Sequence, residues 1–355
     1  MAMDDDEWLE TEASAPMALR LPEADDLQQV VAGPEDAGQR LDKFLADAFP
    51  ALSRSYLKHL IEKARVTRDG VMEVSVSAKV KAGVTYRVAV PPPEPAEPEP
   101  EDIPLRVLYE DAHVLVIDKP AGLSVHPAPG NWTGTLVNAV LWHAGESLKV
   151  VGAMGRPGIV HRLDKDTSGV MVVCKSIFAL SSLGRQFQDR TISRQYQAFG
   201  VGTPKPPWGQ RGRIATRLGR DPHARKKICV LPDTSLAGKQ AATNYEIIAR
   251  FGLGLQGQAQ GAACEMACVL ETGRTHQIRV HMAHIGVPLI GDLVYGDTKA
   301  ARLLATALPE PARLTRQALH AQSLAFTHPA TSERLTFQSD LPEDMLRLKA
   351  ALLEL

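Results

Sequence analysis

Apolar residues at helical spacing predict a small folded unit in the first quarter of the chain. A helix is predicted over residues 40–49, because apolar side chains recur three and four positions apart. A second helix is predicted over residues 54–63, with Ser53 as a favourable N-cap. Alternating apolar residues then predict short strands as far as Pro91. These elements make residues 37–90 a small α+β domain.

From residue 103 onward, strand-like runs alternate with amphipathic helical runs. The strands are predicted over residues 107–109, 114–118, 192–201, 243–249, 263–270, 320–326 and 334–337. The helices are predicted over residues 135–143, 176–190, 273–284 (entered from a loop) and 341–353. On the second of these helices, the residues expected to face inward are Phe178, Leu180, Leu183 and Phe187. Hairpin strands with helices packed on them predict an α+β domain around a mixed, mainly antiparallel sheet.

One polar loop of this larger domain lies between two apolar, strand-like runs. The runs are Ile159-Val160 and Val170 to Val173, both predicted to be short strands. The loop places the imidazole of His161, the guanidinium of Arg162 and the carboxylate of Asp164 within four residues. A sheet would hold the ends of this loop still, as it does where folds present reactive side chains.

Two further segments have the composition of unfolded or extended chain. Residues 1–36 carry eleven acidic side chains, one basic side chain and few apolar anchors, so we expect a disordered acidic tail. Residues 91–102 carry six prolines and five acidic side chains, which predicts a stiff linker. The predicted organisation is therefore a tail, a small domain over residues 37–90, a linker, and a large domain over residues 103–355.

The net charge of −1 hides an uneven distribution of charge. Residues 37–90 have ten basic and five acidic side chains, and residues 103–355 have twenty-nine basic and twenty acidic ones. Both predicted domains are thus basic, while the acid lies in the tail and the linker. Basic domains favour a polyanion as partner, although ordinary solvated surfaces explain the same charge.

Several classes of protein fit the sequence poorly. No apolar run approaches the roughly 20 residues of a membrane helix, and the acidic N-terminus differs from a basic targeting signal. The four cysteines are few and scattered along the sequence, so we expect them to be reduced thiols. We therefore expect a cytoplasmic protein without a membrane partner.

The polar loop from His161 to Ser168 allows several kinds of chemistry. A metal site would use His161 with Asp164 or Asp166, but no Cys or Glu cluster completes a coordination shell. Serine acyl transfer would need an elbow around Ser168 that the Thr-Ser-Gly context lacks. A phosphate-binding loop would need a different glycine spacing. A reactive carboxylate among cationic helpers and a salt-bridged structural turn both remain open.

The small domain resembles the S4 RNA-binding domain. The similarity lies in Arg40-Leu-Asp42 and in Ser53-Arg-Ser-Tyr-Leu-Lys-His-Leu-Ile61. The resemblance implies that basic side chains on the second helix, Arg54 and Lys58 among them, bind RNA phosphates without reading the sequence.

The large domain resembles the RluA-type pseudouridine synthases, and with the S4-like domain it resembles the RluC/RluD-type members. The signature is His161-Arg-Leu-Asp-Lys-Asp-Thr-Ser-Gly169. Three further segments match in order: Lys119-Pro-Ala-Gly-Leu-Ser-Val-His-Pro127, Ile192-Ser-Arg-Gln-Tyr196, and Gly273-Arg-Thr-His-Gln-Ile-Arg-Val-His281 continuing to Gly291-Asp-Leu-Val-Tyr295-Gly. The resemblance implies an isomerase that acts on uridines of ribosomal RNA, with the large subunit as the expected source.

The resemblance also implies roles for individual residues. Asp164 matches the essential aspartate, and Arg279 matches the basic residue that pairs with it. Tyr196 matches the tyrosine that stacks on the target base. Arg162 is similar to the arginine that enters the RNA stack when the uridine is flipped out. The reaction is a redox-neutral isomerisation, so neither a cofactor nor a metal is expected.

Other residues have less specific expectations. His161 is expected to position the loop or to contact the substrate, and Lys119 to contact phosphate or to support its turn. The Pro/Gly-rich basic excursion over residues 202–225, extended by Arg225 and Lys226, is expected to lie along RNA. The alternatives to a monomeric synthase are a non-catalytic RNA-binding or ribosome-assembly factor on the same scaffold and a metal-dependent nuclease.

Overall fold

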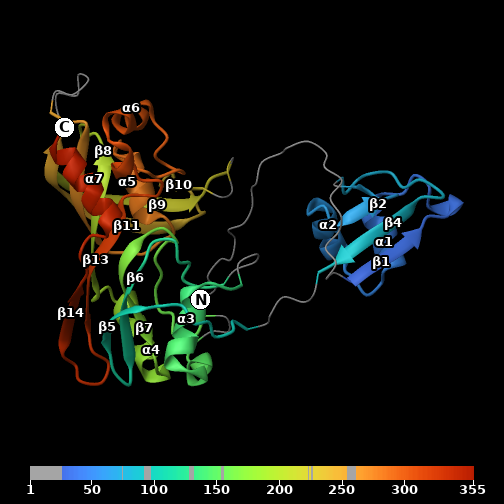
Figure 1. The fold of residues 1–355 in the computed structure, drawn as a ribbon, viewed down its shortest axis with the longest axis horizontal. Coiled ribbons are helices and arrows are strands. Elements are labelled where there is room, and N and C mark those ends of the chain that lie inside the picture. Colours follow the sequence, from blue (N-terminus) through green and yellow to red (C-terminus); the bar gives the residue numbers. More distant parts are fainter. Residues whose placement is uncertain are drawn as a thin grey trace. The chain divides into compact units, whose positions relative to one another are not determined.

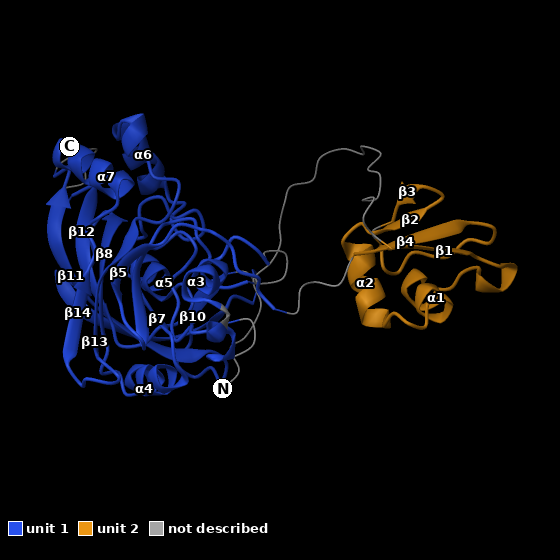
Figure 2. Cartoon of the chain, turned by 60° about the horizontal axis from the view of Figure 1, so that its bottom comes forward, with its two compact units in different colours: residues 1–8, 96–355 blue, residues 9–95 orange. Residues whose placement is uncertain are grey.

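The computed structural model describes residues 26–73, 75–91, 97–127, 132–152, 156–222, 224, 227–253 and 261–355 (Figure 1). The chain divides into two compact units, with the boundary between Pro95 and Ala96 (Figure 2). This boundary lies inside the segment that we expected to be a linker.

The small unit is a four-stranded sheet with two helices. The strand order is β1–β4–β2–β3, and every pair is antiparallel. The elements are β1 (Asp26–Val31), α1 (Leu41–Ala48), α2 (Arg54–Glu62), β2 (Val66–Arg68), β3 (Val71–Met72) and β4 (Thr85–Val90). Apolar residues of both helices, including Leu41 and Leu57, pack on Val66 and Val88 of the sheet. Ser53 caps α2 as predicted, because its hydroxyl accepts the N–H of Tyr56.

Strand β1 corrects the predicted extent of the disordered tail. It pairs with β4 over its whole length, from Asp26 opposite Val90 to Val31 opposite Thr85. A short 3-10 helix, Pro34–Asp36, follows it. The sequence did not reveal β1, because Val30 packs on the core while the other apolar side chains, Leu27 and Val31, remain exposed. The rest of the expected tail, residues 1–25, lies outside the described residues.

The large unit is built on a ten-stranded sheet. Nine strands follow the order β10–β9–β11–β12–β8–β13–β7–β6–β5, and β14 pairs with β13. Only β13 and β7 are parallel, so the predicted mixed and mainly antiparallel sheet is confirmed. The strands are β5 (Arg106–Glu110), β6 (Val114–Lys119), β7 (Ser168–Cys174), β8 (Ser193–Val201), β9 (Arg211–Arg220), β10 (Ile228–Leu231), β11 (Lys239–Phe251), β12 (Ala263–Leu270), β13 (Leu319–Thr327) and β14 (Arg334–Gln338).

Helices cover both faces of this sheet. They are α3 (Leu136–Ala144), α4 (Ile177–Gln188), α5 (Gln277–His284), α6 (Lys299–Ala307) and α7 (Glu343–Leu353). On β8, Tyr196 and Ala198 belong to the core with α3, α4 and α5, whereas Phe199 and Val201 belong to the core with α6 and α7. Short 3-10 turns over Glu146–Val150 and Glu310–Ala312 complete this unit.

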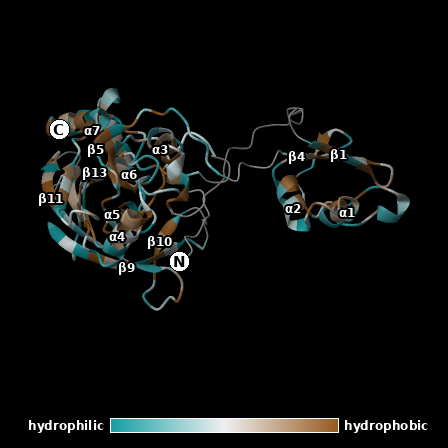
Figure 3. Cartoon of the chain, turned by 90° about the horizontal axis from the view of Figure 1, so that it is seen from below, coloured by the Kyte–Doolittle hydropathy of each residue, from teal (hydrophilic) through white to brown (hydrophobic). Residues whose placement is uncertain are grey.

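Three local predictions differ from the structure. The excursion predicted over residues 202–225 contains strand β9, which pairs with β11 because Ile214 and Leu218 are buried on one side of it. Its alternation of hydrophilic and hydrophobic residues is visible in Figure 3. Phe178 is 55% exposed, because it lies on a different side of α4 from Ala179 and Leu183, which are buried in the core. Ile159 forms only an isolated bridge, to Val173.

The end of the expected linker is attached to the large unit. The main-chain N–H of Glu101 donates to the Asn138 carbonyl at 3.0 Å, and its carboxylate accepts the Gly134 N–H at 2.9 Å. The Asn138 side chain donates to the Glu99 carbonyl at 2.8 Å. Glu99 and Glu101 of the expected linker are therefore bonded to the large unit.

Candidate active site

The polar loop is anchored by a strand with no exposed residue. Every residue of β7, which follows the loop, is buried. Gly169 lies so close to β13 that a Cβ there would be 2.2 Å from the Ala321 carbonyl oxygen, and its φ of +118° also favours glycine. Thr167 donates its main-chain N–H to the Asp164 carbonyl at 3.0 Å, which closes the turn. The loop is thus held rigidly where it enters β7, which lies between β6 and β13 in the sheet.

His161 holds the start of this loop and does not face RNA. Its Nε2 accepts the Val172 N–H at 3.1 Å, and its ring stacks on Phe187 with centroids 4.9 Å apart. Burial, with the nearby charge of Arg194, lowers the pKa of His161 to about 3, so the ring is neutral and can accept. The structure therefore favours the positioning role over the substrate-contacting role.

Lys119 supports its own turn and has no donor left for a phosphate. Its side chain is fully buried. The ammonium donates to the carbonyls of Pro120, Leu123 and Lys165 at 2.8, 2.9 and 3.0 Å. Burial lowers the pKa of Lys119 to about 7, and the charges of Asp164 and Asp166 oppose that shift. Of the two expected roles, the geometry favours support of the turn, because two N–H groups bind carbonyls of the turn and the third binds a carbonyl of the polar loop.

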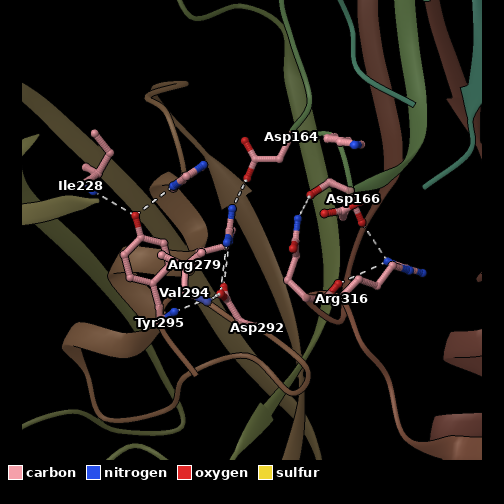
Figure 4. Close-up of polar contacts among 12 residues, drawn as sticks. Asp164, Asp166, Ile228, Arg279, Asp292, Val294, Tyr295 and Arg316 are labelled. Atoms are coloured by element: carbon pink, nitrogen blue, oxygen red, sulfur yellow. Dashed lines mark hydrogen bonds and ion pairs between the residues drawn. The ribbon is translucent and has the colours of Figure 1, made fainter. Parts of the chain in front are cut away.

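Asp164 and Arg279 meet from segments more than a hundred residues apart. An Arg279 Nη1 to Asp164 Oδ2 contact of 3.2 Å joins the loop to α5 (Figure 4). The side chain of Asp164 is 19% exposed and that of Arg279 is 7% exposed. The pairing expected from the resemblance is thus present in the geometry.

Asp292 orients Arg279 from the other side, and the sequence interpretation gave it no role. Its oxygens accept from Nε and Nη2 of Arg279 at 2.7 and 3.1 Å. One of them also accepts the N–H groups of Val294 and Tyr295 at 2.9 and 3.0 Å. Burial opposes ionisation, but Arg279 and these N–H groups hold the pKa of Asp292 below its usual value. Burial also disfavours the Arg279 cation, yet Asp292 and Asp164 raise its pKa above the usual range. The guanidinium is therefore a fixed cation between two carboxylates (Figure 4).

Tyr295 completes the support of Arg279. The Arg279 guanidinium carbon lies 5.2 Å from the centroid of the Tyr295 ring. The Tyr295 hydroxyl accepts the Ile228 N–H at 3.0 Å and lies 2.9 Å from His276 Nδ1. It thus ties α5 to β10.

The second half of the loop is held by Arg316. This guanidinium donates to the Asp166 carbonyl at 3.1 Å (Figure 4). It also makes two bonds, of 2.6 and 2.8 Å, to Asp344 of α7. Ser168 Oγ lies 2.9 Å from His320 Nδ1, within the sheet. Ser168 is therefore part of the support and is not presented as a nucleophile.

Tyr196 and Arg162 differ in exposure. Tyr196 on β8 is only 6% exposed. Burial raises its pKa, with the Asp164 charge adding to the effect and Arg194 opposing it, so the phenol is protonated at neutral pH. Arg162 is exposed between the buried side chains of His161 and Leu163. Tyr196 is thus a buried residue within the influence of the Asp164 charge, and Arg162 is accessible to a large substrate.

In the small unit, Arg54 and Lys58 have unequal surroundings. Arg54 donates to Asp42 at 2.8 Å, and Arg40 contacts the same carboxylate at 3.0 Å. Burial opposes ionisation of Asp42, but the two arginines hold its pKa below the usual value. Lys58 lies 3.8 Å from Glu62, with both side chains about half exposed. Both cations remain available at the surface of α2.

Two of the predicted RNA contacts, Arg225 and Lys226, lie outside the described residues. Among the residues that the structure describes, no group of three or more His, Cys, Asp or Glu side chains is placed to hold a metal ion. No helix within the described ranges is long and apolar enough to cross a membrane.

The fold and the site can be compared with those of known protein families, and both units match a family. Residues 113–284 match the family described as RNA pseudouridylate synthase, and residues 39–85 match the S4 domain. The chain belongs to the RNA pseudouridine synthase family, and its activity is the isomerisation of uridine to pseudouridine in RNA.

Relatives extend the similarity over most of the chain. It is 42% identical to a ribosomal large subunit pseudouridine synthase D of Zymomonas mobilis, over 90% of this chain and 95% of the relative. It is 43% identical to the protein of the same name from Nitrosomonas europaea, over 89% and 85% of the two chains. The solved structure of human RNA pseudouridylate synthase domain containing 4 shares the fold, with a TM-score of 0.51 and 23% identity over 70% of this chain and 92% of that one.

Proposed function

We propose that this protein isomerises uridines of large-subunit ribosomal RNA, with Asp164 as the reactive carboxylate. The observation that carries the proposal is the row of charged groups Asp164–Arg279–Asp292, with contacts of 3.2 and 2.7 Å. The names of the relatives, which are ribosomal large subunit pseudouridine synthases, support large-subunit ribosomal RNA as the substrate.

The reaction needs one bond broken and one bond made at the same sugar carbon. The N1–C1′ bond of the uridine breaks, the base turns, and C5 joins C1′; the C5 proton leaves and N1 ends with a proton. Asp164 acts at the sugar, by attack on C1′ or by promoting a glycal, and Arg279 keeps it aimed. No electron is gained or lost overall.

The surroundings of Asp164 suit a base removed from its helix. A base inside a helix cannot reach a side chain that is 19% exposed, so the uridine must be flipped out. Exposed Arg162, two residues before Asp164, is placed to occupy the vacated position in the RNA. Buried and protonated Tyr196 provides an aromatic surface for the base and a hydroxyl for assistance in removing the C5 proton.

We further propose that the protein acts as a cytoplasmic monomer. Asp164, Tyr196, Arg279 and Asp292 all come from one unit of one chain, so the site needs no second copy. The four cysteines are free thiols, which suits a reducing compartment.

Mapping pseudouridines in ribosomal RNA tests the proposed substrate. Cells that lack this protein should lose one or more pseudouridines of the large-subunit RNA, and the intact gene should restore them. An unchanged map would contradict the proposed substrate and favour a non-catalytic role in ribosome assembly.

A further inference from the structure

Arg194 lies inside the large unit, two residues before Tyr196 on β8. Its guanidinium carbon is 5.3 Å from the centroid of the Phe187 ring. On another side, Gly273 lies so close that a Cβ there would be 2.7 Å from Arg194 Nη1. The glycine that begins the Gly273-Arg-Thr segment therefore leaves room for this guanidinium.

The positive charge of Arg194 has no compensating group. Its Nε is buried and has no hydrogen-bond partner. Among the described residues, no carboxylate forms an ion pair with it. Arg279, which is buried, and Arg316, which is partly buried like Arg194, each hold a carboxylate through two bonds. Burial lowers the pKa of Arg194, which reflects the cost of an unpaired charge.

A partly buried guanidinium that has no ion-pair partner is suited to an anion that the chain itself does not supply. Buried charges in proteins are normally paired and hydrogen-bonded, because removal from water is costly. A guanidinium matches the geometry of phosphate oxygens particularly well. RNA is the polyanion that the activity brings to this site.

The position of Arg194 relative to Tyr196 identifies where such a phosphate would lie. Residues two apart on a strand face the same side, about 7 Å from one another. A uridine stacked on Tyr196 would therefore have its sugar–phosphate backbone within reach of Arg194. The phosphate would therefore lie beside the reacting nucleotide.

We propose that Arg194 binds a backbone phosphate of the RNA segment that carries the target uridine. The inference rests on the proposed function, because it takes RNA as the substrate. Arg194 is a binding residue in this account, and its contact is made in the bound state before the chemical step.

The test compares full-length Arg194→Gln and Arg194→Lys proteins on an unmodified large-subunit ribosomal RNA transcript. Arg194→Gln should raise KM and the Kd for this transcript about tenfold, since a charge-assisted bond is lost. Its log Kd should also depend less steeply on log salt, by about 0.7 to 0.9. The turnover number should stay within about twofold of the wild-type value, and Arg194→Lys should recover the salt dependence.

Arg302→Gln is the matched control, because Arg302 is an exposed arginine that is already paired with Asp297 at 2.8 Å. It should change neither KM nor the salt dependence. A fall in the turnover number at unchanged KM, with a shifted pH profile, would overturn the proposal and show that Arg194 acts through Tyr196.

Two further outcomes remain decisive. If Arg194→Gln does not fold, Arg194→Lys should still raise KM at an unchanged salt dependence, and an unchanged KM would contradict the proposal. If the wild-type protein modifies no uridine of the transcript, the proposed substrate is wrong. The change in RNA affinity then still tests Arg194 by itself.

Discussion

At the scale of single residues, Asp292 sets the orientation of Arg279 and, through it, of Asp164. Removing its charge leaves a buried guanidinium with one partner, and breaking such a pair costs about 3 kcal/mol or more. Asp292→Asn should therefore lower the free energy of unfolding by about that amount. It should also lower the turnover number about tenfold or more, while KM for RNA stays close to the wild-type value.

Urea unfolding and single-turnover kinetics measure the two effects of Asp292→Asn separately. Asp297→Asn is a suitable control, because its partner Arg302 is fully at the surface, with 72% of the side chain exposed. A full single-turnover rate in Asp292→Asn would show that Arg279 does not need this support.

His161 should make stability depend on pH in acid. Its pKa is about 3 in the folded protein and about 6.5 in an unfolded chain. Between these values the unfolded chain binds a proton that the folded chain does not, so stability is lost as pH falls from 6.5 towards 3. The contribution approaches about 1.4 kcal/mol per pH unit.

Urea titrations between pH 7 and pH 4 test this dependence. His161→Asn keeps an acceptor for the Val172 N–H but does not titrate, so its stability should fall less steeply than that of the wild type. Equal slopes in the two proteins would contradict the neutral, buried state of His161.

The residue scale also shows what the sequence could and could not predict. The pairing of Asp164 with Arg279 was predictable, because both residues lie in recognisable segments with a known relationship. The role of Lys119 stayed open between a phosphate contact and support of its turn, since residue type does not show that the fold buries the ammonium against three carbonyls. The role of Asp292 was hidden, because it depends on a contact that only the tertiary structure creates.

At the scale of elements, Arg316 links helix α7 to the polar loop. Arg316→Gln removes both bonds to Asp344 and the bond to the Asp166 carbonyl. Small displacements of catalytic groups cost large factors in rate, so we expect about a tenfold lower turnover number. Single-turnover kinetics on an unmodified transcript measures the change.

Arg347→Gln on α7 is the matched control for this link. It removes an exposed ion pair with Glu343 on the same helix, at 3.1 Å, which is worth well under about 1 kcal/mol. If Arg316→Gln and Arg347→Gln turned over at the same rate, α7 would have no part in holding the loop.

Elements with strong periodicity were predictable, and weakly patterned ones were not. The helices α2, α3, α4 and α7 lie close to their predicted ranges because each has an apolar face or a clear cap. Strand β9 was mistaken for a loop, since its arginines and glycines obscured the burial of Ile214 and Leu218. Strand β1 was mistaken for tail because its pairing with β4, and not its composition, makes it a strand.

At the scale of the whole molecule, we expect two units with separate cores to share the binding of RNA. The small unit has its own buried cluster, and its basic side chains are expected to contribute charge without chemistry. Deleting residues 1–95 should weaken RNA binding about tenfold at roughly 0.2 M salt, while some turnover remains. The cut leaves Glu99 and Glu101 in place, because both contact the loop and helix around Asn138.

Binding and turnover measured across a salt series test this division of labour. The truncated protein should fall furthest behind the full chain at low salt, because a protein with fewer phosphate contacts has a log Kd that depends less steeply on log salt. Equal affinity and equal rate at every salt concentration would show that the small unit does not contribute to binding.

The most direct measurement of the central claim is pseudouridine formation by purified Asp164→Asn protein on an unmodified large-subunit ribosomal RNA transcript. Asp166→Asn serves as the control. It changes a neighbouring carboxylate but keeps the main-chain carbonyl that accepts from Arg316. We predict that Asp164→Asn binds the transcript with wild-type affinity but forms pseudouridine at least about 10,000-fold more slowly, whereas Asp166→Asn stays within about threefold. Wild-type turnover by Asp164→Asn would contradict the assignment of Asp164 as the reactive group.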